Sequence, residues 1–569
     1  MTGVQTCALP ISPTGAAAGA SAGEASPQEI LARRLRGLAD RKLQVEGILC
    51  SAGDAAAFYS SDGWERSLEA DVIDFRTLVS SWWLAPAAEG GFGRGLFKGR
   101  TELAEKVRSG VLSKAAGKVI EVPVHLDALE APAPDISGEL YRETVFVPAA
   151  ATREQLADRL AALFPAGAAG GAGRGRDWFL ELPEASENLS LNMEDERRQV
   201  RDLARKATAL AVAGAGRCFA GLSDPKRGLL GPDLNPRPAY AAWHVLGRYL
   251  AGAECLGPFD LDKAANTSAW AFRRRVEGSE EGFVVFWTDG PEREIPAQLG
   301  TCGRASLVEI TGASQKLRLP RSSAEAGGLR EAEMVPLSNV PALLTGLEPA
   351  LIQTRLGFRL AEGARLECRY EPQTVCFEVP NYFPSDMTAT VYPRFLQGSS
   401  VDPRFRLVNI KAGRSERIEF DIRPSFIETV GAKDIAIDLD LAVKNRRESF
   451  TLTRKLTVES MLTLEHIESY DDDGRTAHVQ LSAGVKAGIK PARNFTDLEV
   501  SMVVPGLGRQ RAVLTDVPTG DSRQMGVPFT VILGSKPQTV YAGVRERNGN
   551  WFANVEISLP AASPSRSRR

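Results

Sequence analysis

The chain has 569 residues, of which 43% are hydrophobic and 25% charged, and its net charge is -2 at pH 7. These proportions are those of an ordinary globular protein with room for several domains. The charge balance excludes the strongly basic surface that is typical of nucleic-acid-binding proteins. No run of about eighteen apolar residues predicts a membrane span.

The N-terminal segment 1–27 is expected to lie outside the folded protein. Residues 1–11, MTGVQTCALPI, match without a mismatch the translation of a common library adapter read from a GTG start codon, so we interpret them as an artefact. Residues 12–27 are rich in Ala, Gly and Ser and lack the apolar content of a packed segment, which indicates a linker. On this interpretation the chain is the C-terminal part of a longer protein.

Between residues 28 and 252, helical and strand patterns alternate, which favours an α/β architecture. Residues 28–41 have a helical pattern, and residues 43–51 are typical of a buried strand. A helical segment at 64–70 precedes a second predicted strand at 71–79.

The next strong strand, 177–182, follows only after about a hundred residues, which is too long for one ordinary βα connection. We therefore expect an insertion at about 100–170, with a strand of its own at 118–126 and a helix at 152–164. The Gly- and Ala-rich stretch 166–176 lacks the Gly-Lys-Ser/Thr ending of a phosphate-binding loop, so we interpret it as a flexible connection.

Two helices and a fourth strand complete this part of the chain. Apolar residues recur at helical spacing over 200–211, which predicts an amphipathic helix ended by Gly214 or Gly216. The fourth strand is predicted at 217–224. A helix is predicted at 238–250, because a proline begins it and a glycine follows its end.

Beyond residue 252 the apolar pattern changes to a period of two, which is typical of β-strands. Strands are predicted at 269–276 and 282–289, with a turn-rich sequence between them. Two later blocks repeat strand-length runs between clusters of Gly, Asp, Asn and Pro. The predicted domains are a β-sandwich at 253–350, an immunoglobulin-like β-sandwich at 351–460, a second β-sandwich at 461–562 and a disordered tail at 563–569.

The cysteine and histidine residues predict no metal site, and no motif predicts a cofactor. No two cysteines have the Cys-x-x-Cys spacing of zinc ligands, and the four histidines are scattered singly. Cys368 and Cys376, on two apparent strands joined around a proline, form either a disulfide across a hairpin or two unpaired thiols. The acidic run 471–473 before Gly474 lacks the EF-hand pattern of a calcium loop, so a hairpin turn is the better interpretation.

The sequence resembles the last two βα units of clan A glycoside hydrolases in three runs: WFLELPE (178–184), SLNMEDERRQVRDLARKATALAVAGAGRCFAGLSD (190–224) and GLLGPDLNPRPAYAAWHVLGRYL (228–250). The resemblance is looser upstream, as far as Leu43. It implies a multidomain α/β plus all-β protein, in which a partial (β/α)8 TIM barrel with strands five to eight is followed by β-sandwich domains. Strands five and six of that barrel would be 43–51 and 71–79.

In that family, strand seven ends in the catalytic nucleophile, and Glu181 stands at this position here. A retaining glycosidase needs two carboxyl groups about 5 Å apart, one as the nucleophile and one as the proton donor. The resemblance places the proton donor, a Glu that follows an Asn, at the end of strand four, and no Asn-Glu pair precedes Leu43. Glu184 and Glu187 follow Glu181 closely, so a shifted alignment of the motif would put one of them at the nucleophile position. They are better interpreted as solvated loop carboxylates.

Other landmarks of the family imply substrate contacts. Asp224 stands at the end of strand eight, and Arg76 stands near the end of strand six, where the family usually has a His close to the sugar. Trp82 and Trp83 follow that strand and form either a sugar-stacking platform or part of the packed core. The Arg in place of a His, and the lack of an aromatic residue at the end of strand eight, indicate an atypical or degenerate active site.

The resemblance predicts a protein that acts on or binds a polysaccharide or oligosaccharide. It also implies that the longer protein to which this chain belongs is a retaining glycoside hydrolase. Because the proton donor is missing, the chain itself is expected to be inactive. The alternative is a non-catalytic carbohydrate-binding or cell-surface scaffold with a degenerate barrel site. A carbohydrate partner implies a secreted or extracytoplasmic protein, and the sugar, the linkage and the oligomeric state stay open.

Overall fold

The computed structural model divides the chain into two compact units. The first consists of Met1–Ala297, Gly303–Leu319 and Ala332–Pro349, and the second of Gln298–Cys302, Pro320–Glu331 and Ala350–Arg569. Apart from single positions and short pieces, the residues that the structure describes are 7–10, 45–48, 81–84, 119–126, 141–163, 176–185, 193–215, 217–221, 226–231, 235–261, 266–297, 305–317, 333–395, 398–472, 474–486, 495–504, 508–518, 525–547 and 549–562.

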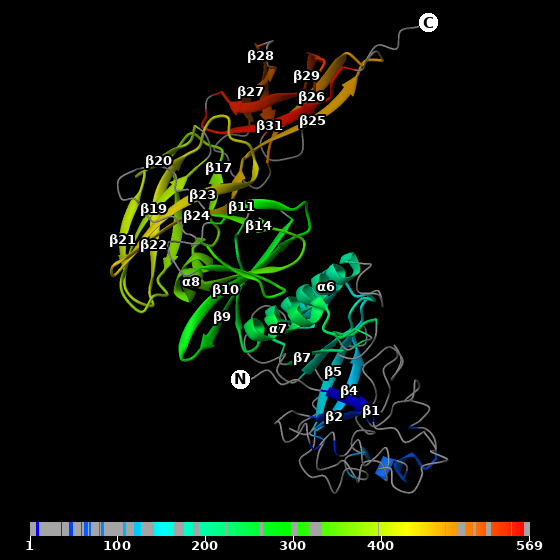
Figure 1. Ribbon diagram of the computed structural model, residues 1–569. Coiled ribbons are helices and arrows are strands. Elements are labelled where there is room, and N and C mark those ends of the chain that lie inside the picture. The colour runs from blue at the N-terminus through cyan, green and yellow to red at the C-terminus, as the bar shows by residue number, and fades with distance from the viewer. Residues whose placement is uncertain are drawn as a thin grey trace, which may run out of the picture. The chain divides into compact units, whose positions relative to one another are not determined.

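The first unit contains a parallel sheet of seven strands (Figure 1, blue to green). Each strand pairs in parallel with the one before it, so the spatial order is β1 to β7. The carboxyl ends of all these strands therefore lie along the same edge of the sheet. The strands are β1 (Cys7–Pro10), β2 (Val45–Ile48), β3 (Ser81–Trp83), β4 (Val119–His125), β5 (Tyr141–Val147), β6 (Arg176–Leu180) and β7 (Arg217–Ala220).

The sheet differs from the sequence prediction in the region 100–170, which is predicted to be an insertion. Strands β4 and β5 both come from that region, and they lie in the sheet between β3 and β6. Strand neighbours are decided by backbone hydrogen bonds between segments far apart in the chain, which the spacing of strands along the sequence does not encode. The region therefore supplies two strands of the sheet itself.

Three further predictions concern the start of the chain. Strand β1 lies within the segment 1–11 that we interpret as an adapter, and it pairs with β2, which falls within the predicted strand 43–51. The predicted strand 71–79 lies outside the described residues except for Val79, and β3 begins just beyond it. The helix predicted at 28–41 also lies largely outside the described residues.

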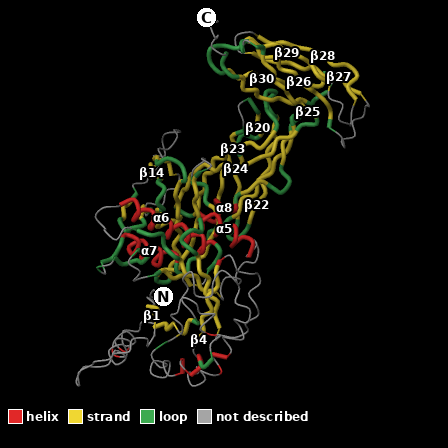
Figure 2. The backbone as a smooth tube through the Cα atoms, turned by 90° about the vertical axis from the view of Figure 1, so that its right-hand side faces the viewer, coloured by secondary structure: helices red, strands yellow, loops and turns green. Residues whose placement is uncertain are grey.

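Helices α5 (Arg153–Leu163), α6 (Met193–Val212) and α7 (Pro238–Leu250) confirm three predicted helices. A proline begins α7, and α6 is followed by Gly214, whose φ of 75° suits a glycine. The apolar sides of the three helices share one core with β5, β6 and an antiparallel sheet. Figure 2 shows these helices in red beside the strands.

The rest of the first unit is antiparallel. The predicted strands 269–276 and 282–289 form the hairpin β9–β10, whose turn has Glu277 and Gly278 at φ of 48° and 85°, as in a type I′ turn. Where the sequence predicts a β-sandwich at 253–350, the structure has a two-stranded sheet and a six-stranded sheet. The helices cover one face of the six-stranded sheet, and Val284 and Phe286, which are 0% and 1% exposed, are buried on its other face. The order of this sheet is β13 (Ser314–Lys316), β12 (Ser306–Glu309), β15 (Ala342–Leu347), β10 (Ser279–Thr288), β9 (Thr267–Val276) and β8 (Glu254–Pro258), and β11 (Arg293–Ala297) pairs separately with β14 (Glu333–Leu337).

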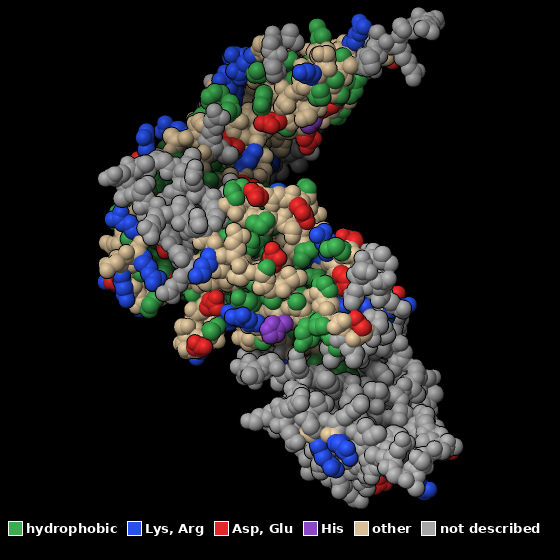
Figure 3. Space-filling model, viewed as in Figure 1, with side chains coloured by type: hydrophobic (Ala, Val, Ile, Leu, Met, Phe, Trp, Pro, Cys, Tyr) green, Lys and Arg blue, Asp and Glu red, His purple; other side chains and the backbone are tan. Residues whose placement is uncertain are grey.

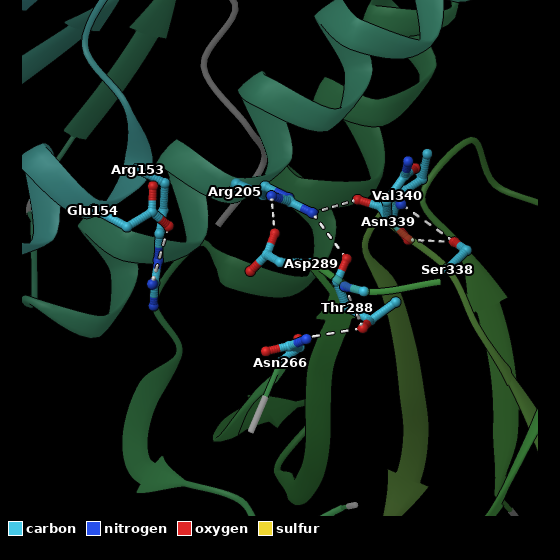
Figure 4. A network of polar contacts seen from close by, with 10 residues as sticks. Arg153, Glu154, Arg205, Asn266, Thr288, Asp289, Ser338, Asn339 and Val340 are labelled. Carbon is cyan, nitrogen blue, oxygen red and sulfur yellow. Dashed lines mark hydrogen bonds and ion pairs between the residues drawn. The ribbon is translucent and has the colours of Figure 1, made fainter. Parts of the chain in front are cut away.

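An arginine network joins α6 to this antiparallel sheet (Figure 4). Arg205 donates to the carboxylate of Asp289 over 2.6 Å and to the backbone carbonyls of Thr288 and Asn339 over 3.2 and 2.8 Å. Its guanidinium also lies 5.6 Å from the ring centroid of the buried Trp287. Because a guanidinium holds its five donors in one rigid plane, this side chain fixes the end of β10 and the segment before β15 against the helix.

The second unit contains two β-sandwiches, which occupy the strand-rich blocks 351–460 and 461–562 (Figure 1). In the first sandwich, a four-stranded and a five-stranded sheet enclose one core, to which α8 (Pro349–Gly357) contributes. The four-stranded sheet has the order β16 (Arg359–Leu360), β18 (Gln373–Pro380), β22 (Ser415–Arg423) and β20 (Ser400–Asp402). The five-stranded sheet has the order β17 (Arg365–Glu367), β24 (Arg446–Glu459), β23 (Gly431–Val443), β19 (Met387–Arg394) and β21 (Arg406–Ile410).

The structure contradicts a disulfide between Cys368 and Cys376, because both thiols are free. Cys368 directly follows β17 of the five-stranded sheet, whereas Cys376 lies in β18 of the four-stranded sheet, so the two residues belong to opposite layers and not to one hairpin. Burial raises the pKa of the Cys368 thiol to about 12. This thiol is therefore protonated and unreactive at neutral pH.

The second sandwich encloses its own core between a three-stranded and a four-stranded sheet. The acidic run 471–473 lies at the turn between its first two strands, where the amide of Gly474 donates to the carbonyl of Asp471 over 2.8 Å; Asp473 lies outside the described residues. The described part of this run is thus a hairpin turn. The sheets have the orders β25 (Leu462–Tyr470), β26 (Thr476–Val485), β29 (Met525–Ile532) and β28 (Gly508–Pro518), β27 (Phe495–Val504), β30 (Gln538–Glu546), β31 (Phe552–Leu559).

A carboxylate surrounded by arginines makes the second sandwich sensitive to acid. Glu499 accepts a hydrogen bond from Arg545 over 2.7 Å, and Arg511 and Arg509 lie 3.7 and 3.9 Å from its other oxygen. The hydrogen bond with Arg545 and the three positive charges lower the pKa of Glu499. The stabilisation of the folded sandwich by the Glu499 charge is therefore complete above the unfolded-state pKa of a glutamate, about 4.3. It is lost as the pH falls through the lower pKa of Glu499 in the folded state.

We expect the melting temperature of Glu499→Gln to lie below that of the wild type at neutral pH and to converge with it as the pH falls below about 4. Thermal unfolding followed by circular dichroism between neutral and acidic pH measures this difference. A difference that stays constant over the whole pH range would show that the arginines do not act on the Glu499 charge.

Candidate active site

Glu181 directly follows β6, at the carboxyl edge of the parallel sheet. Side chains alternate along this strand: Trp178 and Leu180 are buried in the core with the helices, so Phe179 and Glu181 belong to the opposite face. The amide of Glu181 donates to the carbonyl of Val147 over 3.0 Å, which continues the pairing of β5 with β6 by one residue. The strand therefore presents this carboxyl group on the face away from the helices.

Both oxygens of the Glu181 carboxylate accept hydrogen bonds. The amide of Ala149 donates to Oε2 over 2.9 Å, and Arg227 forms an ion pair with Oε1. The same guanidinium also donates to Glu184 over 2.8 Å. The hydrogen bond with Glu184 and the charge of Glu181 raise the pKa of Arg227. Because Glu181 is only 12% exposed, the backbone amide and the guanidinium, and not bulk water, hold its negative charge.

Helix α6 ties together the loops that follow β6 and β7. The amide side chain of the fully buried Gln199 donates to the carbonyls of Pro183 and Lys226 over 3.1 and 3.3 Å. The amide of Ala185 donates to the same Lys226 carbonyl over 2.9 Å. These contacts fix the loop that carries Arg227 beside the loop that carries Glu181.

A buried lysine of α6 holds the loop after β5. Lys206 is fully buried and donates to the carbonyls of Pro148 and Ala149 over 3.1 and 3.2 Å, and its ammonium pairs with Asp202 over 2.8 Å. Burial raises the pKa of Asp202, although the Lys206 charge acts in the opposite direction. Because the amide of Ala149 binds Glu181, Lys206 is a positioning residue for the candidate nucleophile, which it reaches through the backbone.

The tryptophans predicted as a sugar platform lie inside strand β3. Trp82 and Trp83 are 0% and 2% exposed. Trp83 contacts the rings of Phe179 and Phe219 edge-on at 6.2 Å, and Phe179 stacks on Phe146 at 6.0 Å. Neither indole has a free face for a sugar, so the core-packing alternative describes both residues.

Three residues of interest to the prediction, Arg76, Asp224 and Glu187, lie outside the described residues. In the described parts of the chain, no group of three or more His, Cys, Asp and Glu side chains is placed to hold a metal ion.

Neither Lys206 nor Arg227 was predicted from the sequence as a residue of the site. One signal for Lys206 is available, since this charged residue lies on the apolar side of α6, three positions after Leu203 and four before Leu210. Arg227 lies between the family landmarks in a loop without periodicity, and no local pattern marks it.

Comparison with known proteins gives likenesses of structure only. Neither a protein-family model nor a curated protein matches the chain. A Bacteroidetes-affiliated GH5 cellulase linked with a polysaccharide utilization locus is similar at 15% identity and a TM-score of 0.27, over 40% of this chain and 77% of that one.

Two further solved structures are similar over most of this chain. A glycosyl hydrolase family 2 member from Bacteroides cellulosilyticus has 8% identity and a TM-score of 0.24, over 92% of this chain and 54% of its own. A β-glucuronidase from Bacteroides uniformis has 9% identity and a TM-score of 0.25, over 93% of this chain and 56% of its own. The chain thus spans about half the length of these two proteins.

The described surface carries charge of both signs. On the face drawn in Figure 3, acidic and basic side chains are interspersed among the coloured residues, in keeping with the small net charge. None of the described helices is both long and apolar enough to cross a membrane.

Proposed function

We propose that this chain is a carbohydrate-acting protein of the retaining glycoside hydrolase type, with Glu181 as the nucleophile. The observation that carries the proposal is the place of Glu181, at the carboxyl edge of a parallel sheet on the face away from the helices. Enzymes built on parallel barrels collect their reactive groups at this edge, where the loops after the strands form the pocket.

We treat strands β2 to β7 as part of a (β/α)8 barrel and leave out β1, which lies in the segment interpreted as an adapter. Their order along the sheet is their order in the sequence, as in such barrels, whereas doubly wound sheets reverse direction at a switch point. If β6 is strand seven, then β5 and β4 take places six and five, which corrects the assignment of these places to 43–51 and 71–79, and β3 takes place four. Strand β3 ends in Trp83 and is followed by Leu84, so no Asn-Glu pair closes the fourth place.

The proposed chemistry needs a carboxylate anion that is already oriented. Attack by a Glu181 oxygen on the anomeric carbon forms a glycosyl ester and breaks the bond to the leaving oxygen, which takes a proton from an acid. The amide of Ala149 holds one carboxylate oxygen and thereby fixes the direction of the other. With a leaving group that is stable as an anion, the first step needs the nucleophile alone.

The test is to trap the nucleophile on the full chain. We expect dinitrophenyl fluoroglycosides, which carry fluorine on the carbon next to the anomeric carbon and need no proton donor, to form one covalent adduct at Glu181. A panel of gluco-, galacto-, manno- and xylo-configured reagents covers the sugar, and peptide mass spectrometry locates the adduct.

Two variants of similar charge make the trapping experiment specific. Glu181→Gln should abolish the adduct, and Glu184→Gln should keep it, because Glu184 is an exposed carboxylate that shares only Arg227 with the nucleophile. An adduct on another residue, or no adduct with any reagent, would refute Glu181 as the nucleophile.

A second candidate function is carbohydrate binding without hydrolysis. It is favoured by the engagement of both Glu181 oxygens, since Arg227 occupies the oxygen that would attack. In this case the panel gives no adduct, while saccharide binding still perturbs the tryptophan fluorescence of the chain. For either role we propose an extracytoplasmic location.

A further inference from the structure

The outer face of the five-stranded sheet in the first sandwich has an ordered pattern of aromatic and polar side chains. Along β19, the side chains of Met387, Ala389 and Val391 enter the core, so those of Thr390 and Tyr392 belong to the outer face. The register places Tyr392 opposite Asp438 of β23 and Thr390 opposite Asp440.

An exposed aromatic pair lies at one end of this pattern. The ring of Phe405, just before edge strand β21, lies 5.3 Å from the ring of Tyr392 at an interplanar angle of 34°. Phe405 is 51% exposed, and Leu407, which pairs with Thr390, is 59% exposed. The two rings pack against each other at a tilt, and together they form an apolar platform whose exposed part is the Phe405 ring.

Polar groups with a fixed orientation lie directly beside the platform. Asp438 accepts a hydrogen bond from Thr451 over 2.6 Å and pairs with Arg394, and Asp440 accepts from Ser449. These contacts use one oxygen of Asp440, and its other oxygen has no hydrogen-bond partner recorded among the described residues. Asp440 is exposed, so this oxygen can accept a hydroxyl proton from a ligand.

We propose that this outer face, made by Phe405, Tyr392, Thr390, Asp438 and Asp440, is a binding site for a neutral saccharide chain. Pyranose rings have an apolar CH face, which packs on an aromatic platform, and a rim of hydroxyl groups, which hydrogen-bond to carboxylates and hydroxyls. The rows across β21, β19, β23 and β24 supply both kinds of group on one face of the sheet. This site and Glu181 belong to different units of the chain, and the proposal does not depend on the chemistry of Glu181.

The composition of this face favours a saccharide over a protein partner. Stable protein interfaces bury about 800 Å² on each partner around an apolar centre with few charged groups. Here the apolar side chains are confined to the strand edge, and the centre of the face carries carboxylates and hydroxyls. A face with an exposed aromatic edge beside oriented carboxylates and hydroxyls suits a hydroxyl-rich ligand.

The test is native affinity electrophoresis of the full chain in gels that contain hydroxyethyl cellulose, xylan, pullulan or galactomannan. We expect at least one of these polymers to slow the chain. Loss of one ring should weaken the binding about tenfold, which corresponds to about 1.4 kcal/mol and lies within the range for an aromatic contact. Tyr392→Ala and Phe405→Ala should therefore both restore mobility, while Tyr392→Phe keeps the platform and the retardation.

Two controls separate this site from others. Tyr541→Ala, which removes a ring that is 48% exposed in the second sandwich, should leave the retardation unchanged. Covalent trapping measures the proposed nucleophile and gel retardation measures this site, so failure of the one and failure of the other are distinguishable. Phe405→Ala removes a side chain outside the core, so its melting temperature should match the wild type. No retardation by any polymer, or full retardation in the Tyr392→Ala and Phe405→Ala double variant, would overturn the proposal.

Discussion

Replacement of Lys206 by Met is expected to lower the free energy of unfolding of the first unit by about 3–5 kcal/mol, the range for breaking a buried ion pair at one partner. The methionine has a similar length and removes only the ammonium. The carboxylate of Asp202 and the carbonyls of Pro148 and Ala149 then lose the fully buried donor that joins them.

Urea denaturation followed by tryptophan fluorescence measures this effect, because seven of the eight tryptophans belong to the first unit. The matched control is the double variant Lys206→Met with Asp202→Asn, which removes the stranded charge and should recover part of the loss. The single variant should also slow the trapping of Glu181, because the Ala149 amide is no longer held in place. A Lys206→Met chain as stable as the wild type would disprove the structural role of the ammonium.

Replacement of Arg237 by Met is expected to cost a comparable amount, about 3–5 kcal/mol. Arg237 lies at the start of α7 and forms an ion pair with Glu196 in the first turn of α6, and the two side chains are 0% and 9% exposed. The variant leaves the Glu196 carboxylate buried without its cation. The ends of both helices next to the Glu181 loops then lose their connection.

A double-mutant cycle separates the charge from the packing at this pair. Arg237→Met and Glu196→Leu should each destabilise the first unit, whereas the double variant with both substitutions should approach the wild type, because well-packed apolar residues can replace a buried ion pair. The urea midpoint and its slope are the readout. Additive losses in the double variant would show that the two side chains stabilise the unit independently of each other.

Some features of the fold follow from local sequence. Helix α7 lies at its predicted residues, because a proline at its start and a glycine after its end act within one or two turns. The hairpin β9–β10 follows from a period of two and a turn that tolerates positive φ. The strand predicted at 177–182 corresponds to β6, which ends one residue before Glu181, and the resemblance places Glu181 at the end of this strand. In each case the deciding interactions join residues close in the chain.

The tertiary structure decided what local pattern does not contain. Strands β4 and β5 belong to the sheet because their backbones pair with β3 and β6. Trp83 is buried because β3 packs against aromatic residues of β5, β6 and β7, so its sequence neighbours do not reveal its role.

The candidate site also combines a residue that the local sequence identifies with partners that only the tertiary structure identifies. The sequence determined which carboxylate, Glu181, stands at the end of β6. Its partners Ala149 and Arg227 lie 32 and 46 positions away, and Lys206 acts through a loop after another strand. Such contacts form only when the sheet brings distant loops to one edge, because periodicity reports the direction of a side chain and carries no information on which distant residue it meets.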